Sequence, residues 1–113
     1  MVNKALLIGI NYLTSNKYRL RSPINDVNIV KDFLINYLNY QEEDIIILSD
    51  SPKIKENASF FNIVKHIKLF SQELSSQDLL FMYFSGHGST IVDSDGDEVD
   101  KKDEIFLPQD WQV

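Results

Sequence analysis

The chain has 113 residues, 43% of them hydrophobic, and a formal net charge of -6 at pH 7, which suits one globular domain with its own core and is too short for two. Its Lys and Arg residues are scattered, so nucleic-acid binding is not expected, because phosphate contacts need clustered basic residues. The absence of cysteine excludes disulfides, thiolate metal sites and a thiol nucleophile within these residues, and it favours a reducing compartment.

The first predicted strand is the short apolar run from Lys4 to Ile10, which fits a strand that is buried on both faces. Because this run begins close to the amino terminus, we expect no signal peptide. No apolar run in the sequence approaches the roughly 20 residues that span a bilayer. We therefore expect a cytoplasmic protein with no membrane partner.

The first predicted helix begins at Ser22 and Pro23, where a serine that can cap the helix precedes a proline at the first helical position. Apolar residues then recur at steps of three and four, which places them on one face of about four helical turns. We expect this face to pack against a sheet. Its members are Val27, Val30, Phe33, Leu34, Tyr37 and Leu38.

A second buried strand is predicted from Asp44 to Leu48, a compact β-branched run that a polar turn follows. The second predicted helix comes next, with Asn57 or Ser59 as its cap, and we expect His66 to be one of its surface side chains. The apolar face of this helix comprises Phe60, Ile63, Val64, Ile67, Phe70 and Leu74.

The most apolar run, from Leu79 to Phe84, predicts a central strand, and a short strand is expected from Ile105 to Leu107. The alternation of strands and helices predicts a three-layer α/β fold, in which right-handed crossovers build a mostly parallel sheet with helices on both faces. Ligands bind such sheets at the carboxyl ends of the strands. We therefore expect a functional site in the loops after Ile10 and Phe84.

His87 comes just after this apolar strand and lies between Gly86 and Gly88. Flanking glycines permit unusual dihedral angles and a close approach of the backbone to a ligand. A histidine with little bulk around its ring is suited to acid and base chemistry on a substrate. The alternative is that His87 only ends the strand as a polar surface residue.

Several segments occur in order along nearly the whole chain: ALLIGINY, LRSPINDV, EEDIIILSD, LLFMYFSGHGS and DSDGDEVDKKDEIFLPQD. Together they resemble the amino-terminal part of the metacaspases, which are caspase-like cysteine peptidases. The combination of SGHG with the acidic stretch makes the resemblance specific. It implies that residues 1–113 form a partial caspase-like domain, truncated after the third main strand. The activity it implies is endopeptidase cleavage at Arg or Lys peptide bonds of a peptide or protein substrate.

The resemblance also implies roles for single residues. His87 matches the catalytic histidine, which activates a cysteine thiol and protonates the leaving amine. Gly88 matches the position whose backbone amide helps to hold the oxyanion. Asp26 and Ser85 match positions in the pocket for the residue before the scissile bond, and an acidic pocket selects Arg or Lys. Asp26 is also explained as a carboxylate that the helix dipole favours in a first turn, and both explanations can hold together.

An acidic stretch from Asp93 to Glu104 holds seven carboxylates. Hard divalent cations prefer several carboxylate oxygens, and metacaspases are commonly activated by calcium. The resemblance therefore implies a Ca²⁺ site, for which Asp97, Asp100 and Asp103 are candidate ligands. The stretch is not an EF-hand, because a glutamate stands at the sixth position, where the turn requires glycine. The alternative is a solvated acidic loop without a metal.

The chain departs from the metacaspase pattern at two places. The Asp-x-Cys segment that follows a fourth strand in the family is absent, and Pro23 stands where the family usually has a cysteine. Without a thiolate, covalent catalysis is lost, so this chain is not expected to cleave peptides alone.

Three interpretations of the missing cysteine remain open. The chain is a fragment of a longer enzyme, one half of a split enzyme whose second chain or missing C-terminal half brings the cysteine, or an inactive module that binds and regulates an active homologue. The edge of the strand Leu79–Phe84 would then invite a partner. A flavodoxin-like or receiver-like domain is disfavoured, because residues 9–12 supply no phosphate-binding or acidic cluster after the first strand.

Overall fold

The computed structural model describes residues 2–92 and 102–112. No helix in this part of the chain is long and apolar enough to span a membrane. The elements follow one another in the order β1 (Asn3–Gly9), α1 (Pro23–Leu38), a short 3-10 helix (Glu42–Asp44), β2 (Ile45–Ser49), α2 (Phe60–Glu73), β3 (Leu79–Ser85), β4 (Gly88–Val92) and β5 (Lys102–Phe106).

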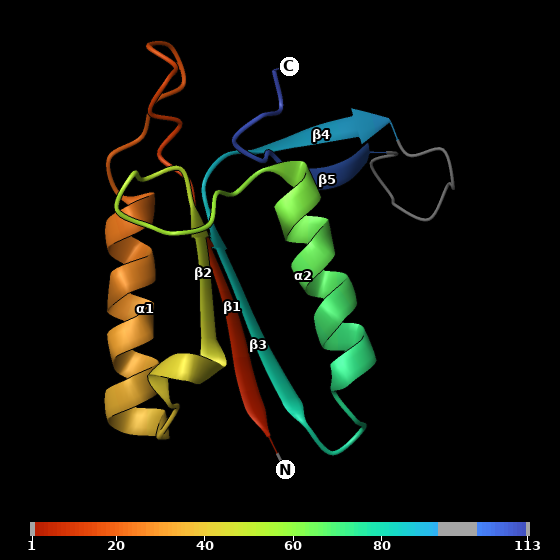
Figure 1. The fold of residues 1–113 in the computed structure, drawn as a ribbon. Coiled ribbons are helices and arrows are strands. Elements are labelled where there is room, and N and C mark those ends of the chain that lie inside the picture. Colours follow the sequence, from red (N-terminus) through yellow and green to blue (C-terminus); the bar gives the residue numbers. More distant parts are fainter. Residues whose placement is uncertain (1, 93–101, 113) are drawn as a thin grey trace.

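Three parallel strands form the main sheet in the order β2-β1-β3, so that β1 lies in the centre (Figure 1). The register places Leu7 of β1 between Ile47 and Tyr83. Figure 1 shows α1 and α2 on opposite sides of this sheet, which confirms the expected three-layer α/β arrangement. Leu79–Phe84 was predicted as a central strand that becomes an edge when the following segment is missing. Among the described residues β1 takes the centre and β3 lies at an edge.

A second, two-stranded sheet of β4 and β5 lies beyond the carboxyl end of the main sheet (Figure 1). The two strands are antiparallel, and Gly88 pairs with Phe106. The sequence predicted a strand at Ile105–Leu107, whereas β5 ends at Phe106 and begins earlier, and β4 was not predicted at all. Because β4 begins directly after His87, this pair of strands holds the histidine segment at the end of the main sheet.

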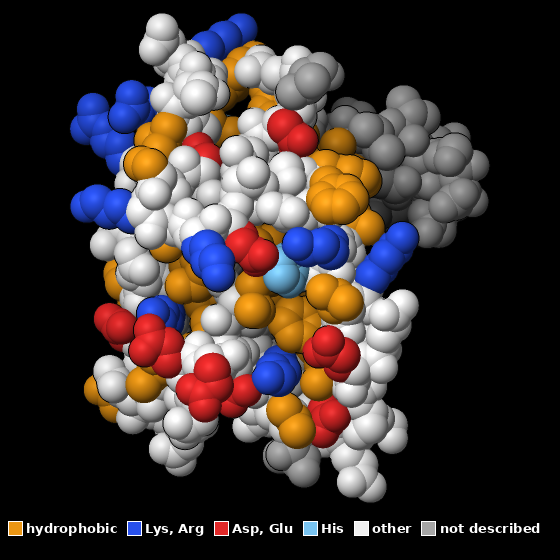
Figure 2. Space-filling view, viewed as in Figure 1, with side chains coloured by type: hydrophobic (Ala, Val, Ile, Leu, Met, Phe, Trp, Pro, Cys, Tyr) orange, Lys and Arg blue, Asp and Glu red, His pale blue; other side chains and the backbone are white. Residues whose placement is uncertain are grey.

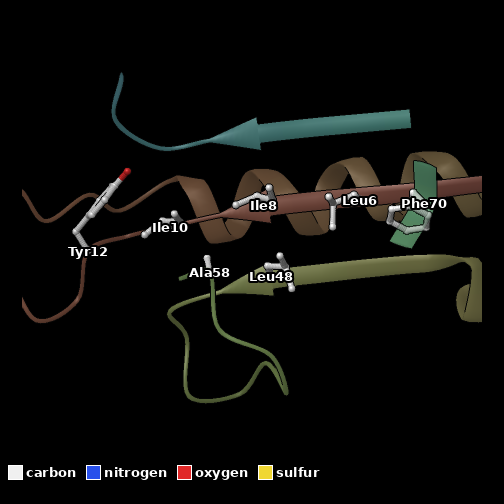
Figure 3. Close-up of a cluster of buried hydrophobic side chains, with 7 residues drawn as sticks. All are labelled: Leu6, Ile8, Ile10, Tyr12, Leu48, Ala58 and Phe70. Atoms are coloured by element: carbon white, nitrogen blue, oxygen red, sulfur yellow. The ribbon is translucent and has the colours of Figure 1, made fainter. Parts of the chain in front are cut away.

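The alternation of side chains along β1 builds two cores. Leu6, Ile8 and Ile10 point to the α2 side of the sheet, and Figure 3 shows them in one row along the strand. Ala5 and Leu7 point to the other side and belong to the cluster under α1. All of these side chains are buried. The strand is therefore covered on both faces, as its unbroken apolar run predicted.

The two helices begin in different ways. The hydroxyl of Ser59 caps α2 by accepting the N–H of Asn62 at 3.2 Å, which confirms one of the two predicted caps. The side chain of Ser22 makes no cap bond to α1, so that prediction is wrong. Instead, the Asn11 side chain accepts the N–H of Ile24 at 3.1 Å. The start of α1 is thereby tied to the loop that follows β1.

The predicted apolar face of α1 is only partly buried. Val27 and Leu34 are buried, whereas Phe33, Tyr37 and Leu38 are 51%, 74% and 48% exposed. Phe33 and Tyr37 pack on each other at the surface, with 5.4 Å between their ring centroids. With about 3.6 residues per turn, Phe33 and Tyr37 fall on one flank of the predicted face, beside the buried Val27 and Leu34 and not beneath the helix.

The face of α2 differs from the prediction in a similar way. Phe60 and Ile67 are 64% and 39% exposed, and Figure 2 shows apolar side chains at the surface near the beginning of this helix. His66 was expected at the surface but is only 8% exposed. Its Nε2 lies 2.7 Å from Oε2 of Glu56, because the segment between β2 and α2 packs against this part of the helix.

Candidate active site

The candidate site lies where β1 and β3 end side by side. Gly9 pairs with Ser85, and the N–H of Ile10 donates to the Ser85 carbonyl at 3.0 Å. The loops after β1, β2 and β3 all lie at this end of the sheet (Figure 1). This is the end at which the strand order predicted ligand binding.

His87 lies in the turn between β3 and β4, where its half-buried ring meets the loop after β1. Its Nε2 is 2.7 Å from the carbonyl oxygen of Tyr18. A carbonyl oxygen only accepts hydrogen bonds, so Nε2 carries a proton and Nδ1 keeps its lone pair in the neutral ring. The Tyr18 ring meets the imidazole edge-on, with 6.2 Å between centroids. This arrangement suits a general base that accepts its proton at Nδ1.

Tyr12 is a buried neighbour of His87 that no sequence pattern singled out. Its hydroxyl accepts the N–H of His87 at 2.8 Å and donates to the Leu107 carbonyl at 2.7 Å. Burial raises the pKa of the Tyr12 phenol above 10.0 and outweighs the bond from His87, which lowers it, while the charge of Asp50 adds to the increase. The phenol therefore stays protonated at neutral pH and remains a donor.

Asp50 follows β2 and holds the chain on both sides of Tyr12. Its carboxylate accepts the N–H of Asn11 at 2.9 Å and the N–H of Leu13 at 2.7 Å. These charge-assisted bonds stabilise the backbone of Tyr12, whose φ of 54° lies in the left-handed region that non-glycine residues rarely adopt. The loop after β1 is therefore anchored to the end of β2.

Asp26 and Ser85 come together, as a shared pocket requires. The hydroxyl of Ser85, at the end of β3, donates to Oδ2 of Asp26 in the first turn of α1 at 3.0 Å. The helix comes this close because residue 9 is glycine: a Cβ there would lie 2.6 Å from the Val27 side chain and 2.7 Å from the Pro23 carbonyl oxygen. Asp26 and Ser85 are both half-buried, so the carboxylate is fixed in place and still partly accessible.

Gly88 is the exposed first residue of β4. A Cβ at this position would lie 3.2 Å from the carbonyl oxygen of Ile105 in β5. The structure thus places Gly88 beside His87 and three residues after Ser85, the last residue of β3. All four predicted site residues, with Asp26 bonded to Ser85, belong to the same end of the main sheet.

The predicted calcium ligands do not fall in the part of the chain that the structure describes. Asp97 and Asp100 belong to residues 93–101, and of Asp103 only the backbone, in β5, is described. Among the described residues, no group of three or more His, Asp or Glu side chains is placed to hold a metal ion. The calcium prediction therefore depends on the chemistry of the carboxylates alone.

Sequence reasoning missed three residues of the candidate site, namely Tyr12, Tyr18 and Asp50. Tyr18 acts through its carbonyl oxygen, which no side-chain pattern can indicate. The Tyr12 hydroxyl contacts residues 75 and 95 positions later in the chain, so no local spacing signals its role. Asp50 follows a parallel strand, and the rule that such positions meet at one end of a sheet could have found it.

Comparisons with known proteins agree on one family. The model of the metacaspase, peptidase C14 domain matches residues 3–113. Metacaspase-1 of Eremothecium gossypii is 42% identical, over 97% of this chain and 24% of its own length. Metacaspase-1B of Aspergillus clavatus is 39% identical, over 97% of this chain and 27% of its own length. The chain thus spans about a quarter of the length of these curated relatives.

A solved structure shares the fold. The crystal structure of protein GSU0716 from Geobacter sulfurreducens matches 97% of this chain and 40% of that chain with a TM-score of 0.66. The sequence identity is 20%, so this likeness concerns the α/β architecture alone. The match of the family model over residues 3–113 shows that the chain belongs to the metacaspase family of peptidase C14 domains.

Proposed function

We propose that this chain supplies the histidine half of a metacaspase-type cysteine endopeptidase site directed at Arg or Lys peptide bonds. The observation that carries the proposal is the contact of His87 Nε2 with the Tyr18 carbonyl, which leaves Nδ1 to accept a proton. The nucleophilic cysteine comes from outside these residues, because they contain none. On its own, the chain is inactive in this proposal.

In the proposed reaction, Nδ1 of His87 takes the thiol proton, and the thiolate attacks the carbonyl carbon of the scissile bond. The imidazolium holds a proton on each nitrogen, and the Tyr18 carbonyl stabilises it by accepting the Nε2–H bond. The N–H of Gly88 is the proposed donor to the oxyanion. Nδ1 then protonates the leaving amine as a thioester forms. A water molecule gives a proton to the same nitrogen and attacks the thioester carbonyl. This releases the acid product and the thiolate, to which the imidazolium returns the proton.

The proposed substrate preference depends on Asp26. Its carboxylate is half-buried and is held by the Ser85 hydroxyl at 3.0 Å, so it offers a fixed negative charge near the end of β3. A guanidinium or ammonium group pairs well with such a carboxylate. We therefore propose that the side chain of the substrate residue before the scissile bond lies against Asp26.

Replacing Asp26 with asparagine is expected to lower kcat/KM for an Arg substrate by roughly 10- to 100-fold, the effect of losing one hydrogen-bonded charge. The kcat/KM for a substrate with a neutral residue before the scissile bond should change far less. The measurement uses a chimera in which residues 3–113 replace the matching segment of Metacaspase-1 of Eremothecium gossypii. Asp32, which is exposed on the same helix, gives the control Asp32→Asn, and an equal loss in both variants would contradict the assignment.

We propose that the segment with the cysteine docks at the free edge of β3. Among the described residues β3 pairs only with β1, so its other edge offers backbone donors and acceptors. A groove of about 340 Å³ adjoins this edge, between α2 and β5. Its lining is mainly apolar and includes Phe60, Ile63, Met82, Phe84 and Phe106. Because this chain spans 24% of the Eremothecium gossypii relative, that relative contains further chain that can cover the groove.

We also propose a second function, an inactive module that binds an active homologue through the edge of β3 that is unpaired among the described residues, and that regulates it. The test is to add the purified chain to intact Metacaspase-1 of Eremothecium gossypii and measure peptide turnover. A regulator changes turnover in proportion to the amount of chain bound. If the chain instead supplies the histidine half of a site, it needs a partner that lacks this segment, and the turnover of the intact enzyme should not change.

We propose that Ca²⁺ binds the acidic stretch. Asp97, Asp100 and Asp103 carry the carboxylate oxygens that this hard cation prefers, and a bound ion would offset the repulsion between their charges. Ca²⁺ at about 100 times its Kd should raise the free energy of unfolding by about 2.7 kcal/mol, measured as a higher Tm. A variant with all three residues changed to asparagine should lose this increase, and an undiminished increase would contradict the assignment.

A further inference from the structure

We propose that Tyr12 is a positioning residue that fixes the backbone of His87 and, through it, the direction of the imidazole. The inference rests on the proposed function, because it gives Tyr12 a task in preparing His87 for proton transfer. It also assigns a role to the loop after β1, which lies far from His87 in the sequence.

The Tyr12 hydroxyl joins two segments of the chain. It accepts the N–H of His87 at 2.8 Å and donates to the carbonyl of Leu107 at 2.7 Å. A further bond runs from the N–H of Leu107 to the carbonyl of His87 at 3.0 Å. The backbone of His87 is therefore held at its N–H by Tyr12 and at its carbonyl by Leu107, which restricts its rotation.

Tyr12 also packs tightly beside His87. Its side chain is 3% exposed, and its ring centroid lies 4.8 Å from that of the imidazole, with 39° between the ring planes. A Cβ at Gly86 would lie 2.9 Å from the Tyr12 hydroxyl. Glycine at position 86 thus lets the phenol approach the backbone of the turn that carries His87.

The backbone of Tyr12 holds a costly conformation that turns its side chain toward this contact. Its φ is 54°, and such strain persists where surrounding bonds sustain it. Asp50 accepts the N–H groups of both neighbouring residues, and Ser15 donates its N–H to the Tyr12 carbonyl at 3.0 Å. Figure 3 shows Tyr12 at the end of the buried row of β1, with its hydroxyl directed toward the segment that follows β3.

Tyr12 and Tyr18 therefore constrain different parts of His87. Tyr18 contacts the imidazole at Nε2 through its carbonyl oxygen, whereas Tyr12 accepts from the backbone N–H. If the Tyr12 hydroxyl is removed, the turn that carries His87 loses one of its two backbone anchors. The imidazole is then held less firmly against Tyr18, and the preference for a proton on Nε2 weakens.

The test is Tyr12→Phe, which removes the hydroxyl and keeps the ring, in the 113-residue chain labelled with ¹⁵N. We expect the His87 amide to exchange with solvent roughly tenfold faster, as the loss of one buried hydrogen bond allows. The ¹⁵N shifts of the imidazole should move toward a mixture of the two tautomers. His66 is the second histidine of the chain, and its signals should stay unchanged.

The control is Tyr40→Phe, because Tyr40 is 6% exposed and packs in the other core, under α1. It should leave the His87 signals unchanged. A folded Tyr12→Phe chain with wild-type exchange and wild-type tautomer at His87 would overturn the proposal. In the unaltered chain, the Tyr12 hydroxyl proton should be protected from exchange and show a nuclear Overhauser effect to the His87 amide. If this Overhauser effect were absent in the unaltered chain, the proposal would be overturned even if the variant does not fold.

The chimera separates this inference from the proposed function. There, Tyr12→Phe should lower kcat about tenfold, by loss of that one hydrogen bond, with little change in KM, because the substrate pocket is untouched. A chimera without activity would count against the proposed function, while the His87 signals of the isolated chain would still decide the role of Tyr12.

Discussion

Replacing His87 with alanine is expected to reduce kcat/KM of the chimera by about 10²–10⁴-fold, the usual contribution of a positioned acid and base. The loss follows from the site geometry, in which Nε2 is engaged by the Tyr18 carbonyl and Nδ1 is left for proton transfer. Without the imidazole, the thiol loses its base and the leaving amine loses its acid. Cleavage of a fluorogenic Arg peptide by wild-type and variant chimeras measures this.

The matched control is His66→Gln. His66 is the other histidine of the chain and lies on α2, where it contacts Glu56. Its replacement should change stability but leave kcat/KM near the wild-type value under conditions in which both chimeras are folded. Equal losses of activity in the two variants, or near-wild-type activity after His87→Ala, would show that His87 is not the base.

The largest expected effect on stability comes from Leu6→Ala. Leu6 lies in the central strand and is fully buried, in the row of apolar side chains between β1 and α2 (Figure 3). Removing a buried leucine side chain loses its transfer free energy and leaves a cavity, at a cost of about 2–5 kcal/mol. Urea denaturation, followed by circular dichroism, should show the midpoint move to lower urea.

The control for this prediction is Leu69→Ala on α2. Leu69 is 41% exposed, so its truncation should change the free energy of unfolding by no more than about 0.5 kcal/mol, as surface substitutions usually do. If Leu6→Ala and Leu69→Ala had similar midpoints, β1 would not be the centre of the core.

The sequence was most informative about elements whose environment is set by their own residues. The run from Lys4 to Ile10 is apolar without alternation, and β1 is covered on both faces accordingly. Ser59 could be predicted as a cap because the bond it accepts, from Asn62, lies within the first helical turn. In both cases the deciding contacts follow from local sequence and from the general rule for parallel sheets.

Contacts between distant segments could not be predicted in this way. Phe33 and Tyr37 have the spacing of a core face, but they lie on its flank, and the packing of α1 on the sheet leaves them exposed. Ser22 has the composition of a cap, yet Asn11 provides the cap bond from another loop. The strand β4 was missed because its first residues are Gly88, Ser89 and Thr90, which give no apolar run, and its pairing with β5 is seen only in the structure.

In the candidate site, too, local features could be predicted and contacts between distant segments could not. The position of His87 could be predicted, since it follows an apolar strand at the end of a parallel sheet where ligands bind. The groups that orient His87 could not be predicted. The Tyr12 hydroxyl and the Tyr18 carbonyl belong to the loop that follows β1, and they contact the histidine only in the folded chain. A residue that acts through its backbone cannot be recognised from a pattern of side-chain types.

The central claim, that this chain supplies the histidine half of a cysteine peptidase site, is tested most directly by complementation. The chain is co-expressed with the rest of the Metacaspase-1 peptidase domain of Eremothecium gossypii, without its matching segment, as a separate polypeptide. We expect the two chains to co-purify and to cleave an Arg peptide that neither cleaves alone. A folded complex of the two chains that does not cleave this peptide, in an assay in which the intact relative does, would contradict the claim.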